Sequence, residues 1–513
     1  MSRQPIVEIP FTVSARTARL IGQENFANAE GAVIELVKNS YDADSSISLI
    51  LIDSISNTLF IIDNGEGMTA DIIKKHWMTI GTDDKKNNFR SKKDRVRTGA
   101  KGIGRFALDR LGKKCRMITK TKSEECQLWE VDWSQFDKED LVISDIKAQL
   151  IQQGDFYIPH EILRILKNYD VDPKVSEYWK DNCGTIIEIL DLKDLWDEKA
   201  IESLYGSLEI LVPPLEANIF SVFLYSALEP SKFGRVYSAN CDDYDYKLIV
   251  NVSKDQKVNI QVFRNELNVP ELIRYGFFEN SKLNEHPYTK KVFEEGSFTI
   301  EKELKSLVSG FSAIDKYNNL SKIGAFEFSF FFLKRGGGQE KDEDIGKYPY
   351  RIVNYSSRSK WLDKFGGIKI FRDNFRVRPY GEIKSSSYDW LDLGKRALSN
   401  PTVTRPGYRV KPQQVYGILN ISRIGNINFE DKSSREGLQE NDVFILFKEV
   451  IISIIEIFEN DRNQVMMSLK KIYEDRNQKE KAKKDAEERI NLKRENKKTQ
   501  DEKVYIEAIE AYK

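Results

Sequence analysis

Three polar side chains near the start of the chain have the spacing of neighbours on one face of a helix. Glu35, Asn39 and Asp42 are separated by four and then three residues, and side chains at these intervals project from the same side of an α-helix. A carboxylate, an amide and a second carboxylate in such a row could hold a metal ion and activate a water molecule. An amphipathic surface helix with a solvated polar face would show the same pattern, so these three residues alone leave both interpretations open.

A second candidate group follows a predicted strand. Residues 58–62 form an apolar run that ends in Asp63, and Gly65, Gly67 and Met68 come directly after it. The glycines would let a flat ligand lie against the backbone, while Asp63 could accept a hydrogen bond from an exocyclic amine and Met68 could pack on a ring face. The alternative is an ordinary glycine turn after a strand.

The third group is a glycine cluster that leads into a predicted helix. It contains Gly99, Lys101, Gly102 and Gly104 and follows a polar run over residues 83–97. Backbone N–H groups and a helix N-terminus can bind phosphates, and Lys101 would add positive charge. The P-loop pattern G-x-x-x-x-G-K-[ST] is missing. The cluster also does not directly follow a strand, which excludes a dinucleotide-binding motif.

These groups must be positioned by a chain of 513 residues, a length that fits about three domains. Hydrophobic residues make up 40% of the chain, enough for real cores, and 80 basic residues balance 80 acidic ones, so net charge favours neither a nucleic-acid nor an acidic partner. The four cysteines form no CxxC pair, which predicts free thiols in a reducing compartment. The sequence has no signal peptide and no apolar run long enough for a membrane span, so we expect a cytoplasmic protein without membrane contact.

In chain order the sequence contains an E-x-x-x-N-x-x-D helix, a D-x-G-x-G strand end, a glycine-rich segment and a late Gly184-Thr185 strand. This series resembles the GHKL ATPase superfamily, which includes gyrase-type topoisomerases, ninety-kilodalton heat-shock chaperones, sensor histidine kinases, MutL and MORC proteins. The resemblance covers about residues 30 to 190. It implies the Bergerat fold, an α/β sandwich whose mixed sheet is covered on one face by helices, with ATP and Mg²⁺ as ligands.

The resemblance also implies a role for each residue. Glu35 would be the general base that orients the attacking water, Asn39 would ligate Mg²⁺, and Asp42 would support the site near the phosphates or the metal. Asp63 would bind the adenine amine, and Thr185 would assist through a water molecule. The adenine pocket would be shaped by Gly65, Gly67 and Met68, and the phosphates would be held by Gly99, Lys101, Gly102 and Gly104. Residues 83–97 would form an ATP lid that nucleotide orders.

The rest of the chain predicts a second α/β domain. Strand-like runs at 246–252, 258–263, 326–333 and 415–422 accompany a predicted hairpin over 366–377. This order resembles the transducer domain of GHKL proteins, which is ribosomal S5-like. The S-R-E-x-L-Q run at 434–439 is similar to the catalytic loop of the heat-shock chaperones, so by resemblance Arg435 would contact the γ-phosphate. Lys432 is a weaker candidate for that contact, and a surface arginine at a helix start is the alternative.

The end of the chain predicts a long exposed helix. From Asp461 onward the sequence lacks Gly and Pro and is dense in charged residues, but its apolar positions keep no clean heptads. It could form part of a coiled coil, and its basic clusters could touch nucleic acid, although a charge run is usually a solvated face. The chain stops within this pattern, so a further domain could follow. The predicted α+β architecture is therefore an ATP-binding domain over 1–228, a transducer-like domain over 229–445 and a helical, coiled-coil-like segment over 446–513.

Together these features predict an Mg²⁺-dependent ATPase that works as a clamp. ATP would order the lid and join two protomers into an ATP-dependent homodimer on a macromolecular client, either DNA or protein. The pattern looks closest to bacterial proteins related to MORC and to the heat-shock chaperones. Some of those proteins belong to phage-defence systems, which would supply a separate effector subunit.

Other function classes remain open. A sensor histidine kinase is one, because His160-Glu161 imitates a phosphoacceptor dipeptide. It lies inside the ATP domain, however, whereas the acceptor helix of a kinase precedes the asparagine helix. A scaffold that binds ATP without hydrolysing it is another, and the presence of Glu35 argues against it. A nuclease is disfavoured because three histidines leave little material for a metal cluster.

Overall fold

The computed structural model describes residues 12–23, 26, 28–80, 90–97, 104–167, 169–211, 219–237, 240–280, 283–308, 319–335, 347–383, 385–432 and 437–511. Contact density divides the chain into two units. Unit 1 comprises Met1–Cys241, Lys369–Tyr380 and Ile418–Gln439, and unit 2 comprises Asp242–Ile368, Gly381–Gly417 and Glu440–Lys513. The domain limits expected at residues 228 and 445 stay a prediction.

Unit 1 is built on an eight-stranded sheet with the order β5-β4-β3-β6-β2-β1-β7-β8. The strand predicted over residues 58–62 is present as β2 (Thr58–Asp63), which pairs antiparallel with β1 (Ile47–Asp53). Because β1 also pairs in parallel with β7 (Ser221–Ser226), the sheet is mixed. The remaining strands are β3 (Gly112–Lys120), β4 (Cys126–Asp132), β5 (Gln149–Gln153), β6 (Gly184–Leu192) and β8 (Arg235–Val236).

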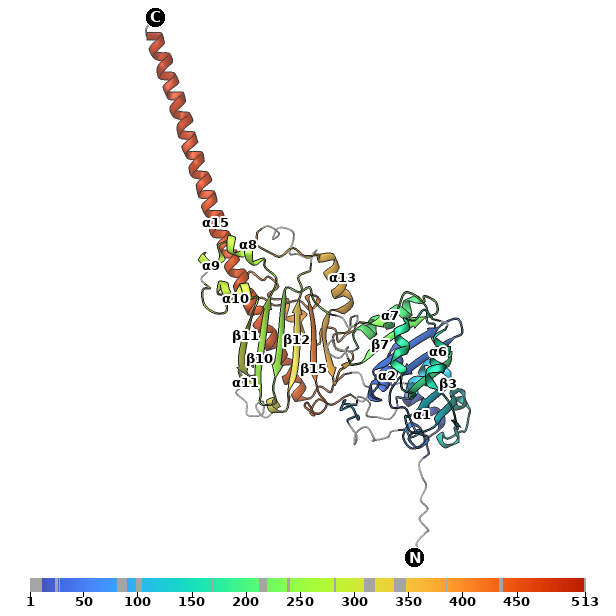
Figure 1. The fold of residues 1–513 in the computed structure, drawn as a ribbon. Helices are drawn as coiled ribbons and strands as arrows, with labels where there is room; N and C mark the ends of the chain where they lie inside the picture. The colour runs from blue at the N-terminus through green and yellow to red at the C-terminus, as the bar shows by residue number, and fades with distance from the viewer. Residues whose placement is uncertain are drawn as a thin grey trace, which may run out of the picture. The chain divides into compact units, whose positions relative to one another are not determined.

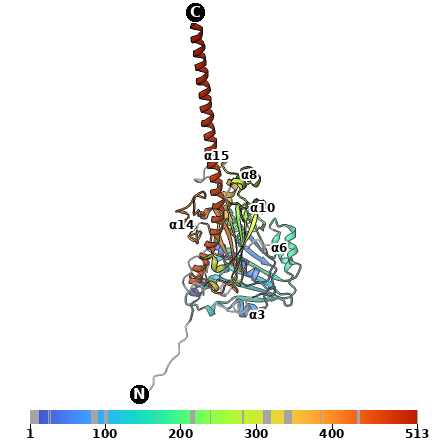
Figure 2. The same cartoon turned by 90° about the vertical axis from the view of Figure 1, so that its left-hand side faces the viewer.

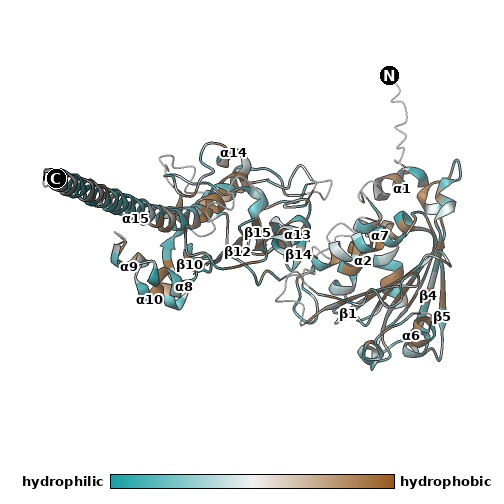
Figure 3. Ribbon diagram, turned by 90° about the horizontal axis from the view of Figure 1, so that it is seen from above, coloured by the Kyte–Doolittle hydropathy of each residue, from teal (hydrophilic) through white to brown (hydrophobic). Residues whose placement is uncertain are grey.

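Helices lie on both faces of this sheet (Figures 1 and 3). One face carries α1 (Ala15–Gln23), α2 (Ala29–Asp42), α5 (Phe106–Leu111) and α7 (Glu198–Glu209), and the other carries α6 (Ile158–Leu166). Side chains alternate along β1, so Ile50 packs under α2 while Leu49 packs under α6. The second face therefore has a core of its own, in addition to the single helical layer that the resemblance implied.

The first of the candidate groups lies on α2, and the local sequence explains why that helix forms. Asn28 caps its N-terminus by accepting a hydrogen bond from the Gly31 N–H at 2.8 Å. The apolar side chains at positions 32, 33, 36 and 37 are buried against the sheet, which leaves the polar face of the helix for other contacts. Shorter helical segments of unit 1 are α3 (Ala70–Ile72), a π-turn (Ile73–Trp77) and 3₁₀ turns at Trp133–Asp137, Ile143–Asp145 and Pro173–Trp179.

The strands outside the eight-stranded sheet follow the order β11-β10-β9-β12-β15-β13-β14. The predicted strand runs are present as β9 (Tyr246–Val252), β10 (Lys257–Arg264), β12 (Phe326–Phe332) and β15 (Val415–Ile421), and β11 spans Ser297–Glu303. The predicted hairpin is β13 (Gly367–Arg372) and β14 (Phe375–Val377). Its turn residues Asp373 and Asn374 both have positive φ, 48° and 72°, as a two-residue hairpin turn requires.

Unit 2 ends in one helix of 70 residues, α15 (Asp442–Ala511), which runs without a break in Figure 2. The long helix predicted from Asp461 onward therefore begins earlier, at Asp442. Its first part is apolar and buried, whereas the charged half is exposed and hydrophilic in Figure 3. The other helices are α8 (Val269–Arg274), α9 (Phe277–Asn280), α10 (Lys290–Glu295), α11 (Leu304–Leu307), α13 (Tyr355–Phe365), α14 (Leu393–Ala397) and a 3₁₀ turn at Pro412–Gln414.

Buried ion pairs fix α15 to the rest of unit 2. Arg462 binds Glu266 through two hydrogen bonds of 2.6 Å each, and Asp461 pairs with Arg264 at 2.6 Å. Burial alone would raise the pKa of Glu266, but the charge of Arg462 outweighs it and holds that pKa below its usual value. These side chains determine which face of α15 meets the sheet, since a rotated helix would leave buried charges without partners.

No helix in the described part of the chain is both long and apolar enough to cross a membrane.

Candidate active site

Asp63 lies at the end of β2, opposite Thr185 on β6. Its side chain is buried, and Oδ1 accepts a hydrogen bond from the Gly65 N–H at 2.8 Å. Burial raises the pKa of Asp63 to about 7, although the Gly65 N–H and the Ser40 hydroxyl both favour the ionised form. At neutral pH a carboxyl group with this pKa is ionised in about half of the molecules and neutral in the rest.

The glycines at this strand end are required by close backbone contacts. A Cβ on Gly65 would lie 2.6 Å from the carbonyl oxygen of Ala43, and one on Gly67 would lie 2.1 Å from that of Lys120. Gly67 also has a positive φ of 69°, which side-chain-bearing residues rarely adopt. The predicted pattern of glycines after Asp63 therefore has a steric cause in this fold.

Thr119 on β3 is a residue of this region that sequence reasoning missed. Its Oγ1 accepts a hydrogen bond from the Met68 N–H at 2.9 Å and lies 3.0 Å from the Oγ1 of Thr185. It thus joins two predicted adenine-pocket residues. The sequence shows a hydroxyl residue at a strand end, but its neighbours depend on the pairing of β3 with β6, which local sequence does not reveal.

The polar face of α2 meets the end of the glycine-rich segment. Gly104 precedes α5, and a Cβ on it would lie 3.4 Å from Asn39 Nδ2 and 3.6 Å from Glu35 Oε1. Glu35 and Asn39 are half-buried here, and Asp42 is buried in the last turn of α2. The structure therefore brings Glu35, Asn39 and Gly104 together.

Several predicted residues cannot be placed. Gly99, Lys101, Gly102 and Arg435 lie outside the described residues. Lys432, beside Arg435 in sequence, is exposed, and its N–H donates to the carbonyl of Gly437 at 3.0 Å.

The described end of the predicted lid, residues 90–97, is attached to the C-terminal end of α2. We call these residues the lid stem. Asp44 accepts hydrogen bonds from the Ser91 hydroxyl and from the Lys93 N–H. The Arg95 guanidinium donates to the carbonyl of Tyr41 at 3.2 Å and lies 4.5 Å from the centre of its ring. These anchors were not predicted, because Asp44 and Arg95 look like surface charges in the sequence.

The donor set fits a magnesium ion that is held together with a nucleotide. Among the described residues no group of three or more His, Cys, Asp or Glu side chains could hold a metal ion. Mg²⁺ commonly uses one or two protein oxygens and completes its shell with phosphates and waters. The side chain of Asn39, whose Nδ2 lies near Gly104, carries an amide oxygen that could serve as such a ligand.

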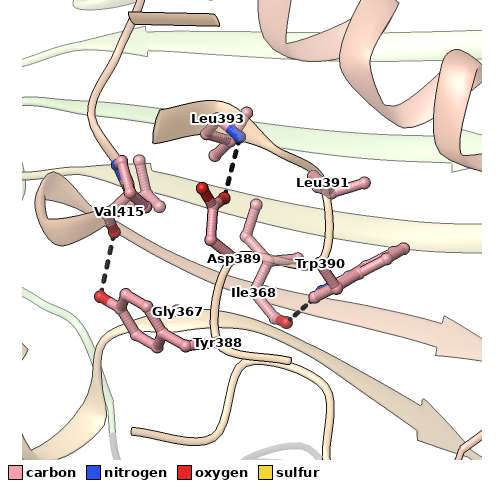
Figure 4. Close-up of a pocket in the computed structure, with 9 residues that line it drawn as sticks. Gly367, Ile368, Tyr388, Asp389, Trp390, Leu391, Leu393 and Val415 are labelled. Carbon is pink, nitrogen blue, oxygen red and sulfur yellow. Dashed lines mark hydrogen bonds between the residues drawn. The ribbon is translucent and has the colours of Figure 1, made fainter. Parts of the chain in front are cut away.

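A small cavity in unit 2 is a poor candidate for the active site (Figure 4). Tyr388, Asp389 and Trp390 line it, and the Asp389 carboxylate accepts the N–H groups of Leu393 and Gly394 at 2.9 and 2.7 Å. Its volume is about 10 Å³, which suits about one water molecule. A nucleotide would not fit.

Comparison with known families identifies the domain that contains the site. Residues 27–162 match the family model described as histidine kinase-, DNA gyrase B-, and HSP90-like ATPase, and no curated protein matches the chain. The matched segment includes α2, the strand end at Asp63 and the Gly104 contact. This confirms the resemblance and the predicted fold class: residues 27–162 match a GHKL-type ATPase domain and belong to an α/β sandwich.

Proposed function

We propose that this protein hydrolyses ATP with Mg²⁺ and uses the nucleotide cycle to close a homodimeric clamp on a macromolecular client. The observation that carries the proposal is the meeting of Glu35, Asn39 and Gly104. A general base, a metal ligand and the end of a phosphate-binding segment converge there, in the same domain as the buried carboxylate of Asp63.

Each residue has a separate task in this mechanism. Asp63 accepts a hydrogen bond from the adenine amine, Thr185 assists through a water molecule, and Met68 packs against the base. Asn39 would hold Mg²⁺, and the ion would neutralise charge on the phosphate oxygens. Glu35 orients a water molecule toward the γ-phosphorus and accepts its proton as the new P–O bond forms and the bond to ADP breaks. Asp42 supports the end of α2 near the phosphates, which Gly99, Lys101, Gly102 and Gly104 hold.

Arg435 adds charge stabilisation from a distant part of the sequence. The described residues on either side of it, up to Lys432 and from Gly437, belong to unit 1. There Leu438 donates its N–H to the Tyr380 hydroxyl at 2.9 Å, and Asp431 binds Arg372 at 2.6 Å. An arginine guanidinium can contact a γ-phosphate with two hydrogen bonds. We propose this role for Arg435, with Lys432 as the second candidate.

The client is proposed on resemblance alone. DNA and protein are both consistent with a clamp, and the likeness to bacterial MORC-related and chaperone-type proteins suggests phage defence with a separate effector subunit. In the clamp, γ-phosphate contacts exist only in the closed state, so ATP shifts the population of protomers toward the closed dimer.

Replacing Glu35 with Gln tests the chemical step. This variant keeps the size of the side chain but removes the base, so we expect the turnover of ATP to fall about 100-fold or more while ATP still binds. Phosphate release measures turnover, and calorimetry measures binding. Unchanged turnover would contradict the hydrolytic mechanism. Stable transfer of labelled γ-phosphate to the protein would instead indicate a kinase.

The mass of the particle tests the clamp. We expect a dimer with a non-hydrolysable ATP analogue and a monomer without it, measured by light scattering. Arg435→Ala should weaken dimer formation more than Lys432→Ala does, and the reverse order would assign the γ-phosphate contact to Lys432. A monomer in both states would refute the clamp. Repeating the measurement with duplex DNA distinguishes a DNA client from a protein client.

A further inference from the structure

Tyr41, at the end of α2, contacts two segments that are far apart in the sequence. One is the lid stem, whose Arg95 guanidinium lies 4.5 Å from the centre of the Tyr41 ring. The other is the turn of the β13–β14 hairpin, where the Asn374 amide donates to the Tyr41 hydroxyl at 3.1 Å and the Phe375 ring lies 4.9 Å away, edge to face. The tyrosine is almost fully buried, with 3% of its surface exposed.

The contact with Arg95 depends on the position of the ring. The guanidinium also donates to the backbone carbonyls of Tyr41 and Ser45. The lid stem therefore contacts the end of α2 through the backbone there and through the side chain of Tyr41. A cation over an aromatic face contributes about 0.5–2 kcal/mol, depending on its desolvation. Movement of the lid stem would therefore change the energy of the Tyr41 ring orientation.

The contact with the hairpin depends on the same ring. The hydroxyl of Tyr41 is fixed by Asn374, and Lys38, one turn earlier on α2, lies 5.9 Å from the centre of the Phe375 ring. Phe375 belongs to the core shared by α2 and the sheet. The hairpin is also held from its other side, since Asp373 accepts the Arg423 N–H at 3.0 Å and Arg372 binds Asp431.

We infer that Tyr41 is a positioning residue that links the lid stem to the β13–β14 hairpin, so that nucleotide bound at the lid changes the stability of the hairpin contact. Asp431, which Arg372 binds, pairs with Leu438 in an isolated antiparallel bridge. A change at Tyr41 can therefore reach this bridge through the hairpin. This inference rests on the proposed ATP site.

Backbone hydrogen exchange tests the link in the intact protein. A non-hydrolysable ATP analogue should slow exchange in residues 90–97 and in residues 369–380 of the wild type. Tyr41→Phe keeps the ring but removes the acceptor for Asn374, and Asn374→Gly removes the donor while tolerating the positive φ of 72° at that position. Each variant should still bind the analogue and protect residues 90–97, but exchange in residues 369–380 should be about fivefold faster than in the liganded wild type. The double variant should show no further loss, because both changes remove the same hydrogen bond.

Tyr205→Phe is the matched control. Its hydroxyl donates to the Arg235 carbonyl at 2.9 Å within the same unit, and we expect this variant to behave as the wild type. The inference is overturned if the analogue binds wild type without protecting residues 369–380, or if Tyr41→Phe and Asn374→Gly keep full protection. Absence of analogue binding to wild type would instead refute the proposed ATP site, and the inference with it.

Discussion

The buried carboxyl group of Asp63 predicts that the affinity for adenine nucleotide depends on pH. Its pKa is raised to about 7 by burial at the end of β2. A hydrogen bond to an ionised acceptor is worth about 1 kcal/mol more than one to a neutral acceptor. An adenine amine bound to Asp63 would therefore lower its pKa by about one unit.

The sign and size of the effect follow from this shift. Because adenine prefers the ionised carboxylate, binding releases part of a proton and the affinity falls as the pH decreases. With a pKa of about 7 in the free protein and about 6 in the complex, the affinity at about pH 6 should be about fivefold lower than at about pH 8. The nucleotide-free domain should lose stability as the pH rises from about 4 to about 7. Over that range the carboxyl group is ionised in the unfolded chain, whereas burial keeps it largely neutral in the folded domain.

Calorimetry with ADP, in two buffers of different ionisation enthalpy, measures both the affinity and the protons released. Asp63→Asn is the control, since it cannot ionise while the phosphates of ADP titrate equally in both proteins. We expect weaker binding by the variant and no contribution from this position to the pH dependence. Equal pH dependence in the two proteins, or tighter wild-type binding at low pH, would refute this role of Asp63.

Three further substitutions test the packing. Gly67→Ala should lower the free energy of unfolding by about 2 kcal/mol or more, since its Cβ would lie 2.1 Å from the Lys120 carbonyl oxygen; thermal unfolding measures this, and an unchanged midpoint would contradict it. Thr119→Val should lower the free energy of unfolding by about 1–2 kcal/mol and weaken ATP binding, because the Met68 N–H loses its acceptor. Thr119→Ser keeps that acceptor and should preserve both stability and ATP binding. Arg462→Met should cost about 3–5 kcal/mol by leaving Glu266 buried and unpaired. Adding Glu266→Met should recover most of that loss in urea unfolding, and no recovery would show that packing dominates there.

The local parts of this structure could be predicted from the sequence. The helix that carries Glu35 and Asn39, the strand that ends at Asp63 and the strand that begins at Gly184 follow from periodicity, caps and glycine positions. Those signals extend over only a few residues, and the three elements are present as α2, β2 and β6.

The contacts between distant segments could not be predicted in the same way. Thr119 reaches Thr185 only because β3 pairs with β6, and Asn374 reaches Tyr41 across more than 300 residues of chain. Such pairings depend on the whole topology, which no single stretch of residues encodes. The contact of Arg95 with Tyr41 could not be predicted either, because a charged residue in a polar run gives no sign that it will bind the end of a helix.

The length of α15 gives its ion pairs a mechanical consequence. At about 1.5 Å per residue, the end of the helix at Ala511 lies about 74 Å beyond Arg462. A tilt of only about 5° at the Arg462–Glu266 pair would move that end by about 6 Å. The buried ion pairs of Arg264 and Arg462 therefore set the direction of a long, stiff helix. A repacking around them that is too small to alter the fold of unit 2 would displace the far end of the helix by a large distance.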